Sequence, residues 1–297
     1  MNHIGEIAAL LTAACFAGSA ISFSTAGERV GSLPVNIIRL VMGLAMLMAL
    51  TSVTRGQPLP LDADAHAWAW LSLSGVVGFA MGDLCLFRAL VEIGPRLSAL
   101  MMSLAPPAAA FFGWLWLDEG LDWLDLAGVT LTFGGIAWAI TARSPMARGP
   151  DRPRPSLRGI LLGLGGAMGQ ALGLVLSKIG MGSYDAFAAT EIRAIAGLVS
   201  FGVLFSVLGI WPRVWAALRD TRTMAITAAG SFFGPFLGVG LSLLAVQNTD
   251  TGVAASLMAT TPILIIPFSV VFRGERVGLG ALGGAIVAVV GVVLLFL

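Results

Sequence analysis

Long apolar stretches separated by short polar segments follow one another along the whole chain. A helix that spans a membrane needs about 20 mostly apolar residues, and ten segments meet this requirement. They lie near residues 4–24, 34–54, 67–91, 95–117, 122–142, 157–177, 186–209, 222–247, 251–272 and 277–296. Most connections between them are short, so we expect neighbouring helices to pack antiparallel. The pattern predicts an all-α membrane protein with ten transmembrane helices.

The second half of the chain repeats the residue pattern of the first. At an offset of 156 residues, the same residue type recurs at matched positions: Pro106 and Pro262, Glu119 and Glu275, Leu126 and Leu282, Gly128 and Gly284, and Gly135 and Gly291. The earlier helices match at an offset of 154, which aligns Arg39 with Arg193. We therefore expect a first repeat at 1–142, a linker rich in proline and arginine at 143–156, and a second repeat at 157–297.

Each repeat contains an odd number of predicted spans. The second repeat must therefore enter the membrane from the opposite face, and the two repeats are expected to be inverted about an axis in the membrane plane. Many secondary transporters have this architecture, with the substrate bound near the midplane between the repeats. The sequence thus predicts two inverted five-helix repeats around a central cavity.

Arginine and lysine are unevenly distributed over the loops between these spans. The odd-numbered loops hold twelve of them, whereas the even-numbered loops hold only Arg55 and Lys178. Because cytoplasmic loops of membrane proteins are enriched in basic residues, the count places the odd-numbered loops in the cytoplasm. We therefore expect a multi-pass protein of the inner (plasma) membrane with both termini on the same, periplasmic side.

The overall composition agrees with this class. Hydrophobic residues make up 57% of the chain, charged residues only 11%, and the mean hydropathy is +0.92. Soluble domains carry roughly 25% charged residues, so this chain has too few to cover itself with a polar surface. The net charge of +1 gives no field that would attract nucleic acid. Cys15 and Cys85 lie inside apolar segments and are interpreted as packing residues.

No catalytic or cofactor site can be assembled from the sequence. His3 and His66 lie outside clusters with metal-ligand spacing, and no phosphate-binding loop is present to couple the chain to ATP. We expect no enzyme activity, no cofactor and no metal. The expected partners are a small-molecule substrate and the lipid bilayer, with no nucleic acid. The oligomeric state is left open, with a monomer as the working assumption.

Matched prolines suggest where a substrate would bind. Pro106 and Pro262 lie midway through the fourth span of each half, where each removes a backbone donor and bends or breaks its helix. Matched interruptions in both halves point to a midplane binding site, although a kink without a ligand is an equal alternative. The other candidates for lining the cavity are Phe16, Ser19, Phe79, Gly82, Met101, Gln170, Phe236 and Met258. Their hydroxyl, amide, aromatic and thioether groups suit a small amphipathic solute, while helix packing explains the small and hydroxyl residues almost as well.

Asp83 is the ionisable residue that lies deepest in a predicted span. Ionisable side chains at membrane depth are candidates for function. Arg39 and Arg88 approach the same side of the membrane from neighbouring spans. The preferred interpretation is an internal ion pair of Asp83 with Arg39 or Arg88, and the alternative is a role in coupling, by binding a proton or the substrate.

Taken together, these residues resemble the EamA family of the drug/metabolite transporter superfamily. The resemblance rests on the two five-span copies and on an arginine, a proline and a glutamate at matched positions of each copy: Arg39 and Arg193, Pro106 and Pro262, and Glu119 and Glu275. It implies an inner-membrane carrier that exports small metabolites by alternating access. In overall character the chain is most similar to the YddG-like exporters of aromatic and other neutral amino acids. The first span lacks the carboxylate that small multidrug members of the superfamily use.

Three functions remain open on the sequence alone. The first is secondary export of neutral or aromatic amino acids, and the second is a broad-specificity drug or toxin efflux carrier of the same superfamily. The third is a membrane scaffold or intramembrane enzyme that transports nothing. The uncharged polar face of the first helix in each half is expected to hold the charged end of an amino acid.

Overall fold

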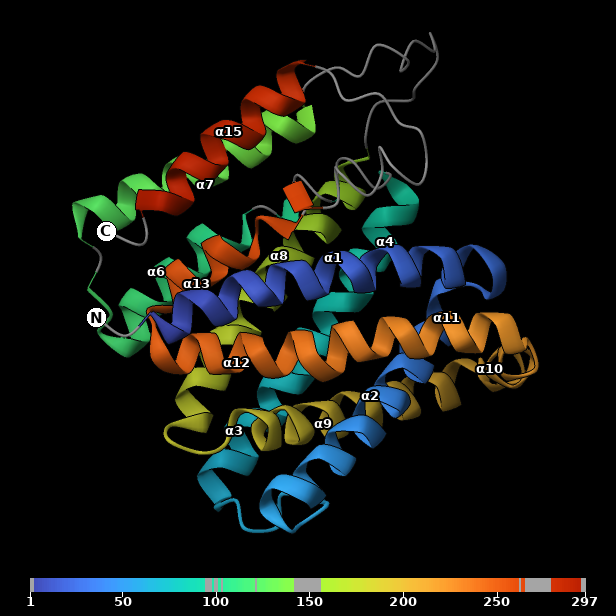
Figure 1. The fold of residues 1–297 in the computed structure, drawn as a ribbon. Helices are drawn as coiled ribbons and strands as arrows, with labels where there is room; N and C mark the ends of the chain where they lie inside the picture. Colours follow the sequence, from blue (N-terminus) through green and yellow to red (C-terminus); the bar gives the residue numbers. More distant parts are fainter. Residues whose placement is uncertain are drawn as a thin grey trace, which may run out of the picture.

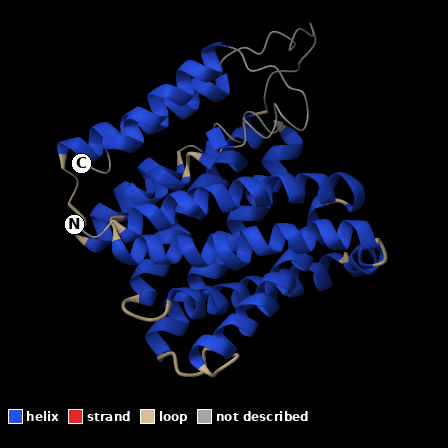
Figure 2. Cartoon of the chain, viewed as in Figure 1, coloured by secondary structure: helices blue, strands red, loops and turns tan. Residues whose placement is uncertain are grey.

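The computed structural model describes residues 3–93, 98, 101–102, 104–120, 122–141, 156–261, 263–264 and 279–294. Over these ranges the chain forms helices joined by turns and contains no strand (Figure 2). The all-helical class predicted from the apolar pattern is confirmed for this part of the chain. Figure 1 shows the helices as a layered bundle, with α7 and α15 side by side along one edge.

We refer to the helices before residue 142 as the first half and to those after residue 155 as the second half. The first half contains α1 (Ile4–Val30), α2 (Ser32–Arg55), α3 (Ala65–Gly75), η1 (Val76–Gly82), α4 (Asp83–Glu92), α6 (Ala105–Leu117) and α7 (Trp123–Thr141). The second contains α8 (Leu157–Met181), α9 (Ala186–Leu208), α10 (Trp211–Leu218), α11 (Thr221–Ser231), η2 (Phe232–Gly238), α12 (Val239–Asn248), α13 (Thr251–Met258) and α15 (Leu279–Leu294). The short helix α10 occupies a stretch that the apolar pattern leaves as a loop.

Six of the described helical segments are long and apolar enough to cross a membrane: Ile4–Val30, Ser32–Arg55, Ala65–Leu86, Leu157–Met181, Ala186–Leu208 and Thr221–Asn248. Each coincides with a predicted span. Parts of the predicted spans at 95–117, 251–272 and 277–296 lie outside the described residues. The count of ten spans therefore stays a prediction.

The outward face of α9 is apolar. Val199, Val203 and Val207 follow one another at helical spacing and are 61%, 61% and 78% exposed. Water would penalise such a stripe, whereas lipid hydrocarbon is as apolar as the side chains themselves. The exposed face of α9 is therefore suited to contact with lipid.

A π-helical segment interrupts one long helix in each half. η1 joins α3 to α4, and η2 joins α11 to α12 at a sequence offset of 156 residues. Such segments are rare and occur preferentially at functional sites. Pro235 lies inside η2, where the altered hydrogen-bond pattern tolerates its missing N–H.

Equivalent helices of the two halves pack in a reciprocal way. α8 lies against α3, η1 and α4, while α1 lies against α11, η2 and α12. α2 packs on α9, and α7 packs on α15. A Cβ atom on Gly135 of α7 would collide with the Ala288 nitrogen of α15, and one on Gly291 of α15 would collide with the Thr132 nitrogen of α7. Position 135 of α7 thus lies against position 288 of α15, and position 132 lies against position 291. Residue numbers rise along one helix as they fall along the other, so α7 and α15 run antiparallel.

Glycines bring α8 into backbone contact with η1. A Cβ atom on Gly169 would lie 2.7 Å from the Cα of Gly82, and one on Gly173 would lie 3.0 Å from the Cα of Gly78. Small residues allow such close approach between membrane helices. The contact fixes the distance between the two halves at the depth of Asp83, the first residue of α4.

Replacing Gly169 with valine is expected to destabilise the protein, because the added side chain must separate α8 from η1. Forcing extra methyl groups into a packed contact costs about 1–3 kcal/mol. Gly134→Val is the matched control, since a Cβ atom there meets nothing within 4 Å. The midpoint of thermal unfolding in detergent should fall for Gly169→Val and change little for Gly134→Val. Equal midpoints for the two variants would contradict this account of the contact.

Candidate functional site

A charged cluster centred on Asp83 lies between the two halves. Asp83 is only 6% exposed. One carboxylate oxygen contacts the Arg39 guanidinium of α2 in an ion pair, and the other accepts a hydrogen bond from Gln170 Nε2 of α8 at 3.2 Å. The cluster therefore joins α2 and α4 of the first half to α8 of the second. Ionisable groups at this depth are rare unless they are paired or functional.

Arg39 is held by neighbours besides Asp83. Its Nε donates a hydrogen bond to Asn36 Oδ1 at 2.6 Å. Its guanidinium carbon lies 5.3 Å from the centre of the Phe23 ring of α1, within the range of a cation–π contact. Arg39 therefore has a carboxylate, an amide oxygen and an aromatic face around it.

Arg193 of α9 is a second buried cation beside Asp83. It is 4% exposed, and its guanidinium carbon lies 5.0 Å from the centre of the Phe79 ring of η1. Its Nε is buried without a hydrogen-bond partner among the described residues. The sequence marked Arg193 only as the repeat equivalent of Arg39. Its proximity to Asp83 follows from the packing of α9 on η1, which no local pattern signals.

Arg88, the other arginine considered for Asp83, is exposed on α4. It forms no ion pair with another described residue, and Asp83 pairs with Arg39 instead. Gly82 faces the α8 backbone at Gly169. It thus contributes a close helix contact beside the cluster.

Phe16 and Ser19 on α1 pack against η2. A Cβ atom on Gly238 would lie 2.7 Å from Phe16 Cε1, and one on Gly234 would lie 3.2 Å from Ser19 Cβ. The Ser19 hydroxyl donates to the carbonyl of Phe16 at 3.1 Å. In this conformation the polar face of α1 is therefore engaged by its own helix and by η2.

The remaining candidates lie on several helices. Met101 is half-buried against Gly163 of α8, and Phe236 of η2 packs on Phe232, with ring centres 5.4 Å apart. Met258 is buried in the core at the end of α13. Two further positions carry the matched prolines. Pro106 is buried in the first turn of α6, which tolerates its missing N–H, and Pro262 lies outside the described residues.

A second, partly buried ion pair links the halves away from Asp83. Lys178 Nζ of α8 lies 2.7 Å from Glu119 Oε1 and donates to the carbonyl of Thr249, also at 2.7 Å. Glu119 also accepts from the backbone N–H of Thr251 at 2.8 Å and from its hydroxyl at 2.7 Å, at the first residue of α13. Lys178 lies near a helix end, where reaching toward the membrane surface is the ordinary expectation. Its pairing depends on the contact between α6 and α13.

Glu191 of α9 is a buried carboxyl group that the cluster does not use. It is 0% exposed, accepts a hydrogen bond from the Thr51 hydroxyl at 2.6 Å, and leaves Oε2 without a partner in the described structure. Thr51 lies near the end of α2 and Glu191 near the start of α9. The bond therefore indicates that α2 and α9, like α7 and α15, run antiparallel.

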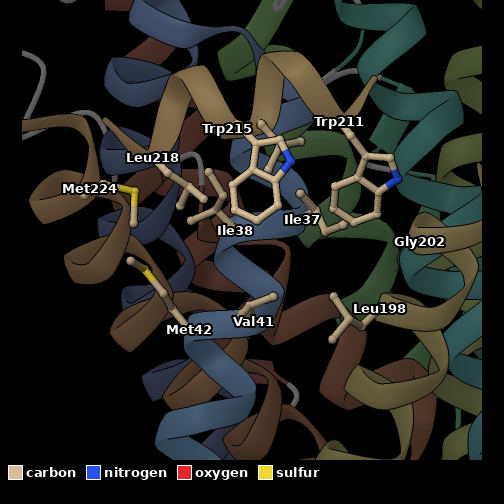
Figure 3. Close-up of a pocket in the computed structure, with 11 residues that line it drawn as sticks. Ile37, Ile38, Val41, Met42, Leu198, Gly202, Trp211, Trp215, Leu218 and Met224 are labelled. Atoms are coloured by element: carbon tan, nitrogen blue, oxygen red, sulfur yellow. The ribbon is translucent and has the colours of Figure 1, made fainter. Parts of the chain in front are cut away.

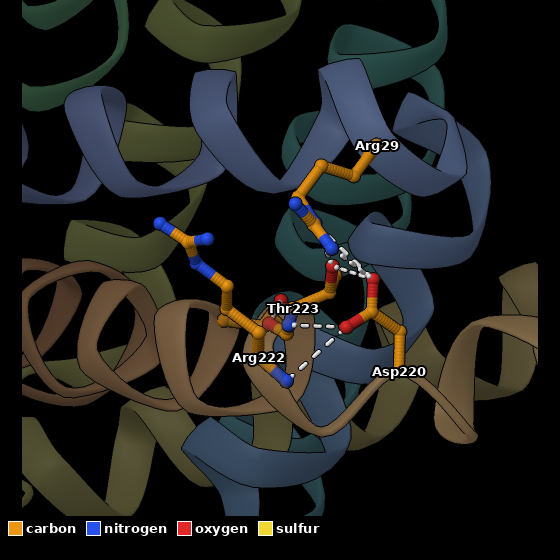
Figure 4. A network of polar contacts seen from close by, with 5 residues as sticks. Arg29, Asp220, Arg222 and Thr223 are labelled. Carbon is orange, nitrogen blue, oxygen red and sulfur yellow. Dashed lines mark hydrogen bonds and ion pairs between the residues drawn. The ribbon is translucent and has the colours of Figure 1, made fainter.

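The end of α1 is tied to the start of α11 by Asp220 (Figure 4). Arg29 Nη2 lies 2.9 Å from Asp220 Oδ2. Asp220 also accepts from the Thr223 hydroxyl at 2.8 Å and from the backbone N–H groups of Arg222 and Thr223 at 3.1 Å each, which caps α11. The hydrogen bonds from Thr223, followed by the contact with Arg29, lower the pKa of Asp220 to about 2.

This depressed pKa predicts how the link between α1 and α11 responds to acid. A carboxyl group with a lowered pKa in the folded state stabilises the fold above its unfolded pKa, and this contribution is lost as the pH falls through the folded value. We expect Asp220→Asn to lower the thermal midpoint relative to the wild type between pH 5 and 7. The difference should shrink toward zero as the pH approaches about 2. A difference that stays constant over this range would contradict the assignment.

An apolar groove of about 440 Å³ lies between α2, α9, α10 and α11, and none of the cluster residues lines it. Figure 3 shows Trp211 and Trp215 of α10 pointing toward Ile37 and Ile38 of α2. Only apolar residues and Gly202 line it. A site for a polar solute needs a few convergent polar groups, so this groove does not replace the Asp83 cluster as the candidate site.

Comparison with protein families accounts for both halves of the chain. The model of the EamA-like transporter family matches residues 3–141 and 157–297. The chain belongs to the EamA-like transporter family. This EamA-family protein is accordingly a multi-pass membrane protein.

Two relatives of the EamA-family protein extend the comparison. One, named "Uncharacterized transporter YvbV", from Bacillus subtilis (strain 168), is 26% identical over 221 residues, which cover 72% of this chain and 69% of the relative. The other is a solved structure described only as "Crystal structure of protein". It matches with a TM-score of 0.77 over 99% of this chain and 96% of its own, at 17% identity. That likeness bears on the fold alone, while the family and the first relative both indicate a membrane transporter.

Proposed function

We propose that this EamA-family protein is a secondary transporter that exports neutral and aromatic amino acids across the inner membrane. The observation that carries the proposal is the Asp83 cluster, in which buried charged and amide side chains converge from both halves. A neutral amino acid carries one carboxylate, one ammonium group and an apolar side chain. The cluster offers cations, a carboxylate and an amide beside aromatic rings, and so has a counterpart for each.

The mechanism that we propose is alternating access between two inverted five-helix repeats of ten spans in total. The antiparallel pairs α7 with α15 and α2 with α9 support this arrangement, because equivalent helices of inverted repeats run in opposite directions. The reciprocal packing of α1 and α8 on the π-helical segments supports it further. The proposed cavity lies on this seam, as in other transporters built from inverted repeats. Both termini are placed on the periplasmic side by the arginine and lysine count, with the monomer as the working unit.

The proposed cavity walls combine the sequence candidates with the charged cluster. Phe16, Ser19, Phe79, Gly82, Met101, Pro106, Gln170, Phe236, Met258 and Pro262 are assigned to the walls, and Asp83 and Arg39 to the charged end. Aromatic and thioether side chains form a surface that accommodates varied apolar groups. The halves are proposed to move about Pro106 and Pro262. Pro106 lies where α6 begins, and the sequence predicts an interruption of the helix at Pro262.

Export from living cells tests this function against broad-specificity efflux. A bacterial host that overproduces the protein should resist the toxic analogue p-fluorophenylalanine and gain no resistance to the lipophilic cation ethidium. Asp83→Asn, checked for equal amounts in the membrane, is the control and should remove the resistance. Resistance to ethidium alone would favour drug or toxin efflux. Resistance to neither compound would count against export and favour a scaffold or intramembrane enzyme.

A further inference from the structure

The Asp83 cluster holds more positive than negative charge. Arg39 and Arg193 approach it from α2 and α9, and Asp83 is the carboxylate between them. The repeat explains the imbalance, because the two arginines are equivalent at an offset of 154. The residue 156 positions after Asp83 is Val239, so the second half supplies no second carboxylate. One positive charge is left over at membrane depth.

That charge resides on Arg193, because the surroundings of the two arginines differ. Arg39 has Asp83 as its ion-pair partner and Asn36 as a hydrogen-bond acceptor. Arg193 has no ion-pair contact with another described residue, its Nε is buried without a hydrogen-bond partner among them, and its guanidinium packs on the Phe79 ring. A ring covers one face of the guanidinium plane and accepts none of its five N–H donors.

A buried guanidinium without acceptors is unfavourable unless something else supplies them. The backbone of η1 lies close to this group at Gly78. A Cβ atom on Gly78 would lie 3.4 Å from Arg193 Nη2, so the glycine keeps that side free of a side chain. Phe79 covers one face of the guanidinium plane, so an acceptor would have to approach along the edge, where the N–H groups point.

We propose that Arg193 binds the carboxylate of the transported substrate. A carboxylate presents two oxygens to the guanidinium edge and forms paired, charge-assisted hydrogen bonds with it. The carboxylate supplies the negative charge that Arg193 lacks, so Arg39, Arg193, Asp83 and this carboxylate sum to zero, while the ammonium group of the substrate adds its own positive charge. This inference rests on the proposed function. It assigns carboxylate recognition to Arg193 rather than to the uncharged face of α1, whose Ser19 is bonded within its own helix.

Competition on the wild-type protein tests the inference without any substitution. Proteoliposomes are loaded with phenylalanine, and the counterflow of labelled phenylalanine is measured with unlabelled competitors outside. Phenylalaninol, which has the same ring and amine but no carboxylate, should compete at least about tenfold less well than phenylalanine. Equal competition would overturn the inference and leave the proposed function intact. Absence of any counterflow in the wild type would instead overturn the proposed function, and the inference with it.

Substitution then separates binding from mere packing. Arg193→Gln should raise KM for phenylalanine at least about tenfold. It should also reduce the difference in how well phenylalanine and phenylalaninol compete for counterflow. Arg193→Lys keeps the charge but loses the two-pronged geometry, and should fall between the wild type and Arg193→Gln. Arg55→Gln, which removes an arginine paired with Asp62 outside the cluster, should leave both values unchanged. An unchanged KM and an unchanged difference in competition in folded Arg193→Gln would overturn the assignment. If neither variant folds, the wild-type competition decides alone.

Discussion

Replacing Asp83 with asparagine is expected to cost about 3–5 kcal/mol of stability, the loss seen when one member of a buried ion pair is removed. The substitution leaves the half-buried Arg39 without its ion-pair partner and the buried Arg193 without a carboxylate nearby. For a protein of this size the thermal midpoint should fall by on the order of 5–10 °C. The Asp83→Asn substitution should also abolish export, because the charged end of the proposed site is lost. Thermal unfolding in detergent measures the first effect.

Two comparisons distinguish this effect from a general loss of charge. Asp62→Asn removes a carboxylate from an ion pair near the surface, with Arg55, and should shift the midpoint little because solvent screens such pairs. The double variant Asp83→Asn/Arg39→Gln should be more stable than Asp83→Asn alone, since it removes one orphaned cation. If Asp83→Asn unfolded at the same thermal midpoint as the wild type, the cluster would not contain a stabilising buried ion pair.

Replacing Glu119 with alanine is the second change expected to have a large effect. Glu119 accepts hydrogen bonds from Lys178 and from the backbone and hydroxyl of Thr251, all across the boundary between the halves. Its loss leaves Lys178 without a carboxylate and the first residue of α13 without its acceptor. We expect a loss of about 3–5 kcal/mol, measured as a lower thermal midpoint.

Glu92→Gln is the matched control for Glu119→Ala. Glu92 pairs with Arg158, which is 71% exposed, and should contribute at most about 1 kcal/mol. Lys178→Met combined with Glu119→Ala should be less damaging than the sum of the two single changes, because the two residues share one interaction. Additive losses would show that Glu119 and Lys178 do not act as a pair.

Much of the helix arrangement can be predicted from the sequence because the second half of the chain repeats the residue pattern of the first. Aligning Arg39 with Arg193 and Gly135 with Gly291 identifies which positions are equivalent. In the structure Gly135, Gly291 and Arg193 lie at contacts between the halves, whereas Arg39 contacts Asp83 and Phe23 within the first half. Apolar segments mark the long helices, because about 20 apolar residues are what a helix needs to cross the hydrocarbon core of a bilayer. The π-helical segments are not predictable in this way, since they change the hydrogen-bond pattern and leave the hydrophobic pattern intact.

The partners of the charged residues are harder to read from the sequence. Asp83 stands out because carboxylates are rare at membrane depth. The choice between Arg39 and Arg88 depends on how α2 packs beside α4, which sequence spacing does not specify. The pairing of Lys178 with Glu119 cannot be predicted from the sequence either, because it also depends on how helices pack. In each case the residue is visible in the sequence, and the neighbour is supplied by tertiary packing.

We propose that the seam between the halves carries an amino acid across the membrane. Counterflow in proteoliposomes tests it most directly, with unlabelled phenylalanine inside and labelled phenylalanine outside. We expect wild-type vesicles to accumulate label transiently above the equilibrium level, and protein-free vesicles and Asp83→Asn vesicles not to do so. Folded wild-type protein that accumulates no label with phenylalanine or any other neutral amino acid would contradict it.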